Sequence, residues 1–133
     1  MPAPNTVQCV VVTPERTVLD AAVDFVAVPM YDGELGVLPG RAALIGRLGP
    51  GELRTQRGSE IQRFYVEGGF TQIRDNVVTV LTARAVKAQE INTQAANQAL
   101  EARATTEDQF RAKDRARVQL RIARRASGEP APH

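Results

Sequence analysis

The side chains that most often perform nucleophilic catalysis are scarce in this chain and lie far apart. Its single cysteine, Cys9, stands within an apolar run, and its single histidine, His133, is the last of the 133 residues. A nucleophilic thiol needs a neighbouring base or cation that generates the thiolate, and no such group accompanies Cys9 in the sequence. We therefore predict that Cys9 is a small buried apolar residue and that the chain has no catalytic site.

Carboxylates and glycines also form no recognisable site. Four carboxylates fall within fifteen residues, namely Asp20, Asp24, Asp32 and Glu34. The surrounding pattern places them on different strands and turns, which favours solvated side chains over an acid–base pair or a metal site. Two glycine-rich turns, at residues 33–36 and 49–51, precede no predicted helix, although a phosphate-binding loop would require one. The sequence therefore predicts neither a metal site nor a cofactor.

Positive charge is concentrated near the C-terminus. Residues 1–91 carry nine basic and ten acidic side chains (net −1), and residues 92–133 carry eight and five (net +3), which together give the overall charge of +2. One predicted helix holds most of these basic residues around a single acid, Asp114: Arg111, Lys113, Arg115, Arg117, Arg121, Arg124 and Arg125. Such a helix could be a solvated face, a nucleic-acid contact or a docking surface for an acidic protein. Phe110 is its one aromatic residue, which argues against stacking of single-stranded bases.

The elements that would position these side chains differ between the two parts of the chain. Up to about residue 90, short apolar runs alternate with turns; the runs cover residues 7–12, 23–30, 34–38, 42–48, 52–57, 61–67, 70–74 and 77–83. Pro14 and the Asp32-Gly33 pair mark two of the turns. Strands at this spacing, with no helical pattern between them, predict a β-sandwich or barrel.

The last third of the chain has a helical composition. From Asn92 onward, no glycine or proline occurs before Gly128, and alanine is frequent. Asn92 or Thr93 can cap a first helix, and Thr106 with Gln109 matches a capping box for a second. The predicted organisation is a sandwich domain (1–90), an antiparallel two-helix hairpin (91–127) and a disordered tail (128–133).

The second predicted helix has an apolar stripe made mostly of alanine: Ala112, Ala116, Leu120 and Ala123. An alanine stripe packs closely but removes little apolar area from water. At about 25 cal/mol per Å², it contributes only a few kcal/mol. We therefore predict that the hairpin is held weakly and can open.

The overall composition is that of an ordinary soluble protein, with 43% hydrophobic and 24% charged residues. No apolar run is long enough to span a membrane, and the N-terminus lacks the pattern of a signal peptide. A single cysteine also permits a reducing compartment. These features lead us to expect a soluble protein of the cytoplasm.

Two motifs resemble the signatures of the epsilon subunits of bacterial F-type ATP synthases. Residues 33–42 read Gly-Glu-Leu-Gly-Val-Leu-Pro-Gly-Arg-Ala, where that family usually has Gly-Glu-Leu-Gly-Ile-Leu-Pro-Gly-His-Ala. Residues 65–70 read Tyr-Val-Glu-Gly-Gly-Phe and resemble the second signature. The resemblance extends from about residue 7 to residue 126. It implies a mainly β fold, a ten-stranded β-sandwich followed by two helices, in a rotor subunit that is not itself catalytic.

The resemblance also implies partners. In that family the sandwich binds the gamma subunit and sits on the ring of membrane c subunits, which implies contacts of Glu34 and Arg41 with the c-ring. The helices can fold against the sandwich or extend along gamma, where their basic residues face an acidic loop of the catalytic β subunits and restrain ATP hydrolysis. The implied location is the cytoplasmic face of the bacterial plasma membrane, reached only through the complex, with no nucleic acid bound.

Three departures from the family pattern bear on function. Arg41 replaces the usual histidine and Ala43 the usual proline. Arginine can still donate hydrogen bonds to the ring, but it does not titrate near neutral pH. Some members bind ATP through the motif Ile/Leu-Asp-x-x-Arg-Ala at the start of the helices, and here Asn92 and Ala95 replace its aspartate and arginine. We therefore expect no regulatory ATP site.

A function of another class also fits the residues themselves. The chain could be an adaptor whose β-sandwich binds a protein and whose basic helical tail binds nucleic acid or an acidic protein. An enzyme ranks third, because no reactive groups converge. The coupling ion of an ATP synthase is determined by other subunits.

Overall fold

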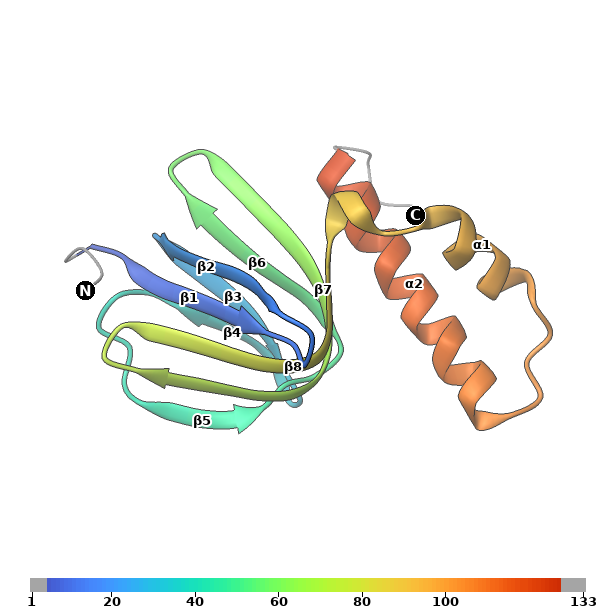
Figure 1. Cartoon of the computed structure of the whole chain (residues 1–133), viewed down its shortest axis with the longest axis horizontal. Coiled ribbons are helices and arrows are strands. Elements are labelled where there is room, and N and C mark those ends of the chain that lie inside the picture. Colours follow the sequence, from blue (N-terminus) through green and yellow to red (C-terminus); the bar gives the residue numbers. More distant parts are fainter. Residues whose placement is uncertain (1–4, 128–133) are drawn as a thin grey trace.

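The computed structural model describes residues 5–127, with layered strands beside a pair of helices (Figure 1). The described chain forms eight strands: β1 (Val7–Val12), β2 (Thr17–Val23), β3 (Phe25–Met30), β4 (Gly33–Val37), β5 (Leu44–Arg47), β6 (Gly51–Arg57), β7 (Glu60–Arg74) and β8 (Val77–Lys87). A 3₁₀ turn, η1 (Ala88–Glu90), leads into two helices: α1 (Thr93–Glu101) and α2 (Glu107–Ser127). The predicted fold class, a β-sandwich followed by a helical hairpin, is confirmed.

The strands follow the order β2-β1-β8-β7-β6-β3-β4, and β5 pairs with β7 beside this path. All pairs are antiparallel except β1 with β8, which is parallel. The long strand β7 changes partner along its length: its first part, up to Val66, pairs with β6, and its last part, from Phe70, pairs with β5. Gly68 and Gly69, both with positive φ, lie at this change of partner. The glycines therefore sit where β7 passes from one layer of the sandwich to the other.

Alternation of side chains along the strands builds the core. In β1, Val7, Cys9 and Val11 are fully buried, whereas the residues between them are partly exposed. They pack with inward-facing side chains of the other strands, among them Leu53 and Phe64. The prediction that Cys9 is a buried apolar residue is confirmed. Burial, with a smaller contribution from the charge of Asp20, raises the pKa of the thiol to about 12, so Cys9 stays protonated.

The strand assignment differs from the predicted one in three places. Eight strands are present where the resemblance implies ten. The predicted strands at 61–67 and 70–74 are one strand, because β7 continues through the two glycines with its register to β8 unchanged. The predicted strand at 23–30 begins only at Phe25, and an unpredicted strand, β2, precedes it. Strand β2 was missed because it lies at the sheet edge and its burial does not alternate.

The helix ends agree with the predicted caps. The Oδ1 atom of Asn92 accepts a hydrogen bond from the backbone N–H of Ala95 at 2.9 Å. Thr106 and Gln109 form the reciprocal capping box, in which each side chain accepts from the other's backbone N–H, at 3.2 and 3.1 Å. The predicted disordered tail, 128–133, lies outside the described residues.

The apolar contacts of α2 go beyond the predicted alanine stripe. Ala116 and Leu120 pack against Ala96 of α1, as a stripe between two helices should. Ile122, which the stripe did not include, is fully buried against the sandwich end. Helix α2 therefore packs on both α1 and the sandwich, and the predicted stripe, which is mostly alanine, did not include this second contact.

Candidate functional site

The surface that joins α2 to the sandwich contains a hydrogen-bonded charge cluster. The guanidinium of Arg115 donates two hydrogen bonds to the carboxylate of Glu67, at 2.6 and 2.9 Å. The hydroxyl of Tyr65 donates to the same carboxylate at 2.7 Å. Nearer the end of α2, Arg125 lies 3.1 Å from Glu52, which also pairs with Arg63 at 2.7 Å. Two predicted regulatory arginines therefore hold the helix on the sandwich.

The other basic residues of α2 point elsewhere. Arg111 pairs with Glu107 and Arg117 with Asp114, both within the helix and both at 2.8 Å. The Nζ of Lys113 donates to the carbonyl of Leu100 at the end of α1.

Arg121 and Arg124 form no ion pair within the part of the chain that the structure describes. The sequence prediction set Asp114 alone against the basic residues of α2. It missed Glu107, four residues from Arg111, as well as Glu67 and Glu52, which lie 48 and 73 residues away from their partners.

The charge cluster shifts the titration of its members. The hydrogen bonds from Arg115 are the main reason that the pKa of Glu67 lies below its usual range, and the hydroxyl of Tyr65 contributes in the same direction. Burial, and then the hydrogen bond to Glu67, raise the pKa of Tyr65. Glu67 is therefore ionised, and Tyr65 neutral, throughout the physiological pH range.

We expect docking of the hairpin to weaken in acid. When folding lowers the pKa of a carboxyl group, the ionised group stabilises the folded state fully at pH values above its pKa in the unfolded state. This stabilisation is lost as the pH falls through the lower pKa of the folded state. The contribution of Glu67 should therefore be complete above about pH 5 and decline below about pH 4. Hydrogen exchange of α2 amides, compared with those of β1 and β8, should show the helix losing protection first. The Glu67→Gln variant should lack this pH step, and a step of equal size in both proteins would contradict the assignment to Glu67.

Glu34 and Arg41, the predicted c-ring contacts, lie near opposite ends of strand β4. Glu34 lies next to the Tyr31-Asp32 turn, and its carboxylate is 3.8 Å from the guanidinium of Arg54. Arg41 is exposed in the loop after β4, which is tied to the far turn of the sandwich by a 2.7 Å hydrogen bond from the Gly40 N–H to Asn76. The segment between the two residues is strand β4 with a turn at each end, and the structure does not bring the side chains of Glu34 and Arg41 together.

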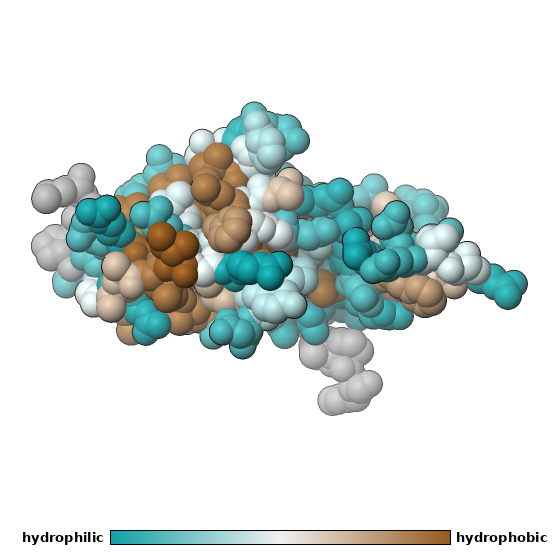
Figure 2. All heavy atoms as spheres, turned by 90° about the horizontal axis from the view of Figure 1, so that it is seen from below, coloured by the Kyte–Doolittle hydropathy of each residue, from teal (hydrophilic) through white to brown (hydrophobic). Residues whose placement is uncertain are grey.

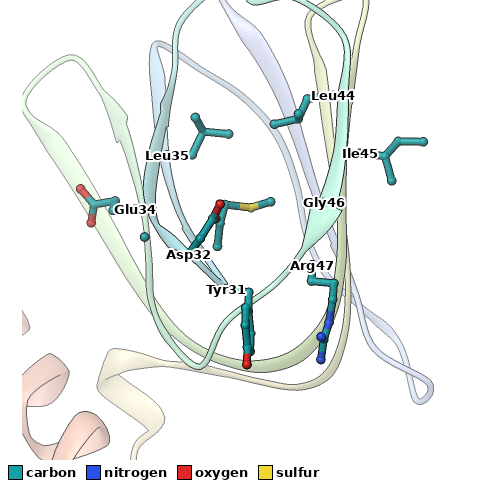
Figure 3. A pocket seen from close by; sticks show the side chains of 10 residues that line it. Tyr31, Asp32, Glu34, Leu35, Leu44, Ile45, Gly46 and Arg47 are labelled. Carbon is teal, nitrogen blue, oxygen red and sulfur yellow. The ribbon is translucent and has the colours of Figure 1, made fainter.

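A groove of about 580 Å³ separates the β3–β4 hairpin from β5 (Figure 3). Leu35 and Leu44 point into it from its two sides, whereas Ile45 points away to the outer surface. At its mouth, the guanidinium of Arg47 lies 4.6 Å from the centre of the Tyr31 ring. This is the distance of a cation–π contact, so each of these exposed side chains orders the other.

The outer face of the sheet carries an apolar row that the sequence analysis missed. Phe70 is 56% exposed and Leu81 is 52% exposed, and they are direct cross-strand partners on β7 and β8. Val12 of β1 continues the row beyond Leu81, and Arg47 of β5 ends it beside Phe70. The face in Figure 2 shows apolar side chains over the sandwich half, while the helical half is mostly hydrophilic. The sequence of β8 gives part of this information, because Val80 and Leu81 are adjacent apolar residues whose side chains must point to opposite faces of the sheet.

The residues at the position of the family's ATP motif lie at the start of α1. The Oδ1 of Asn92 is occupied as the cap of α1. The neighbouring hollow, about 320 Å³, lies between α1 and α2 and is lined by Thr93, Asn97 and Arg124 among others. Among the described residues, no three His, Cys, Asp or Glu side chains gather as a metal site. Neither helix within residues 5–127 combines the length and the apolar character that crossing a membrane would need.

Comparison with known proteins finds similarity along most of the chain. Residues 6–88 match the family described as the β-sandwich domain of ATP synthase delta/epsilon chains. The chain is 50% identical over 127 residues to the ATP synthase epsilon chain of Rhodopirellula baltica, covering 90% of this chain and 99% of that one. It is 39% identical over 89 residues to the epsilon chain of Nitratidesulfovibrio vulgaris, covering 67% and 66% of the two chains. A chain of the Euglena gracilis mitochondrial ATP synthase superposes with a TM-score of 0.70 over 96% of this chain and 83% of that one, at 23% identity. The similarity to this Euglena gracilis chain concerns the fold alone.

Proposed function

The chain belongs to the family of ATP synthase epsilon chains, and on that premise we propose that it is a non-catalytic subunit of the central stalk of an F-type ATP synthase. In this role it ties the gamma subunit to the c-ring, so that rotation of the ring turns the shaft. The observation that supports this most is the similarity to an epsilon chain over both the sandwich and the hairpin. The proposed division of labour assigns assembly to residues 1–90 and regulation to residues 91–127.

Gamma is proposed to cover the outer apolar row of Phe70, Leu81 and Val12. Contiguous exposed apolar side chains on a small soluble domain are typical of protein-binding surfaces. Strand β4 is proposed to lie along the c-ring, so that Glu34 near one end of the strand and Arg41 beyond the other end can both face the ring. The protein would then lie at the cytoplasmic face of the bacterial plasma membrane and touch the membrane only through the complex.

Binding to gamma tests this proposal. In the full-length chain, Phe70→Asp should lower the affinity for purified gamma at least about tenfold, because it places a charge in a buried apolar contact. Ile61→Asp is the matched control, since Ile61 is also exposed, at 46%, but lies at the β6–β7 turn outside the row. Circular dichroism should show both variants folded. Equal affinity of Phe70→Asp and the unmodified chain would refute this docking face.

Helix α2 is proposed to act as a brake on ATP hydrolysis when the hairpin leaves the sandwich. Arg117, Arg121 and Arg124 would then face an acidic loop of the catalytic β subunits. This proposal includes no regulatory ATP site, since Asn92 serves as a helix cap, and no nucleic-acid partner, since Arg115 and Arg125 are engaged with the sandwich.

Removal of the brake should raise ATP hydrolysis. We expect deletion of residues 106–133 to increase the ATPase rate of the assembled complex severalfold, with a smaller change in ATP synthesis. The double variant Arg117→Ala/Arg121→Ala should act in the same direction, because it weakens attraction to an acidic surface without touching the contact of Arg115 with Glu67. Unchanged hydrolysis in complexes of verified subunit composition would leave α2 as a passive solvated helix.

A further inference from the structure

Arg47 is a cation placed at the end of an apolar surface. On β5 it is the cross-strand neighbour of Phe70, and its guanidinium rests over the ring of Tyr31. Within residues 5–127 it forms no ion pair, although Asp32 and Glu34 line the neighbouring groove. The guanidinium edge, which carries the hydrogen-bond donors, is thus left without a carboxylate.

A crevice of about 360 Å³ opens beside Arg47, between the sandwich and α2. The charged groups on its helical side are already neutralised within the chain. Arg111 pairs with Glu107, Asp114 with Arg117, and Arg115 with Glu67. Among the described residues that line this crevice, Arg47 is therefore the cation whose charge is still available to a partner.

Burial of the apolar row imposes a requirement on whatever covers it. A partner that excludes water from Phe70 also removes water from part of its neighbour Arg47. A guanidinium cannot lose its proton to avoid this cost, and an unpaired buried charge is strongly unfavourable. A carboxylate of the partner at this position would offset this cost with charge-assisted hydrogen bonds, and the stacking on Tyr31 holds the guanidinium plane ready for it.

We propose that the Arg47–Tyr31 pair is a recognition element for a carboxylate that stands at the end of an apolar segment of the partner. The pair gives an otherwise non-directional apolar contact an orientation, since Arg47 stands at the Phe70 end of the row. This inference rests on the proposed function, in which the partner that covers the row is the gamma subunit, and it adds the chemistry that gamma must offer.

Affinity measurements with purified gamma and the full-length chain test the inference. Arg47→Ala should weaken binding at least about tenfold, and Arg47→Glu should weaken it further, because it sets two carboxylates against each other. Arg47→Lys should recover part of the affinity, and Tyr31→Leu should cause a smaller loss because the guanidinium is then less ordered. The salt dependence of binding should be flatter for Arg47→Ala than for the unmodified chain.

Arg57→Glu supplies the matched control, because Arg57 is an exposed arginine at the β6–β7 turn, outside the row. If Arg57→Glu weakens binding as much as Arg47→Glu, the effect is one of net charge and the inference is wrong. If Phe70→Asp weakens binding but Arg47→Ala and Arg47→Glu do not, the inference fails while the proposed docking face stands. If Phe70→Asp has no effect, the docking face fails and the inference fails with it.

Discussion

Replacing Gly69 with alanine is expected to leave little or no stably folded chain. Gly69 has φ of +113°, a conformation that side chains with a Cβ rarely adopt. An added Cβ would overlap the backbone carbonyl of Leu81 on the neighbouring strand. Because the position of a Cβ is fixed by its own backbone and the carbonyl is a backbone group, no change of rotamer can relieve the overlap. The cost should exceed about 4 kcal/mol, a large fraction of the roughly 5–15 kcal/mol by which a typical domain is stable.

The Gly68→Ala variant measures how much stability is lost through an unfavourable backbone conformation alone, without a steric clash. Gly68 also has positive φ, +73°, but no atom lies within 4 Å of the position its Cβ would take. This control should cost only about 1–2 kcal/mol. Thermal unfolding followed by circular dichroism would show a modest drop in Tm for Gly68→Ala and loss of the transition for Gly69→Ala. Similar drops for both variants would mean that β7 can shift away from β8 at this point.

Truncation of Ile122 should free the hairpin from the sandwich without unfolding the sandwich. Ile122 is fully buried against Tyr65, Ala88 and Ile91. Removing most of such a side chain costs about 2–5 kcal/mol, from lost apolar burial and from the cavity that remains. Amide hydrogen exchange in α2 should therefore accelerate by about thirtyfold or more in Ile122→Ala. Exchange in the core strands β1 and β8 should not change.

Leu120→Ala is the matched variant for this experiment. Leu120 lies two residues away and packs on Ala96 of α1. Its truncation should loosen α1 and leave α2 docked. If the brake proposal holds, Ile122→Ala should also lower ATP hydrolysis in the assembled complex, because the released helix spends more time extended, whereas the deletion of residues 106–133 raises it. Equal protection of α2 in Ile122→Ala and the unmodified chain would show that the charge pairs alone hold the hairpin.

Several features of this protein are determined by residues that are close together in the sequence. The caps at Asn92 and Thr106 involve groups three residues apart, and both agree with the predicted ones. The β3–β4 turn, which the Asp32-Gly33 pair indicated and which lies at Tyr31-Asp32 with Gly33 opening β4, and the burial of Cys9 likewise follow from short patterns. The two signature motifs identify the family in the same way, since each is a short run of residues. Such features need no knowledge of how distant segments meet.

Tertiary structure decided the rest, because the local pattern leaves several arrangements open. Alternation in β8 indicates that Val80 and Leu81 face opposite sides, but not which side another layer covers, so the exposed row with Phe70 could not be predicted. The long strand β7 looked like two strands, because its glycines are equally typical of a turn. The pairing of Arg115 with Glu67 depends on where α2 docks, since 48 residues separate the two. Docking in turn follows from Ile122 and Val118, which lie four residues apart on one side of α2, but only the sandwich end decides that this side is covered.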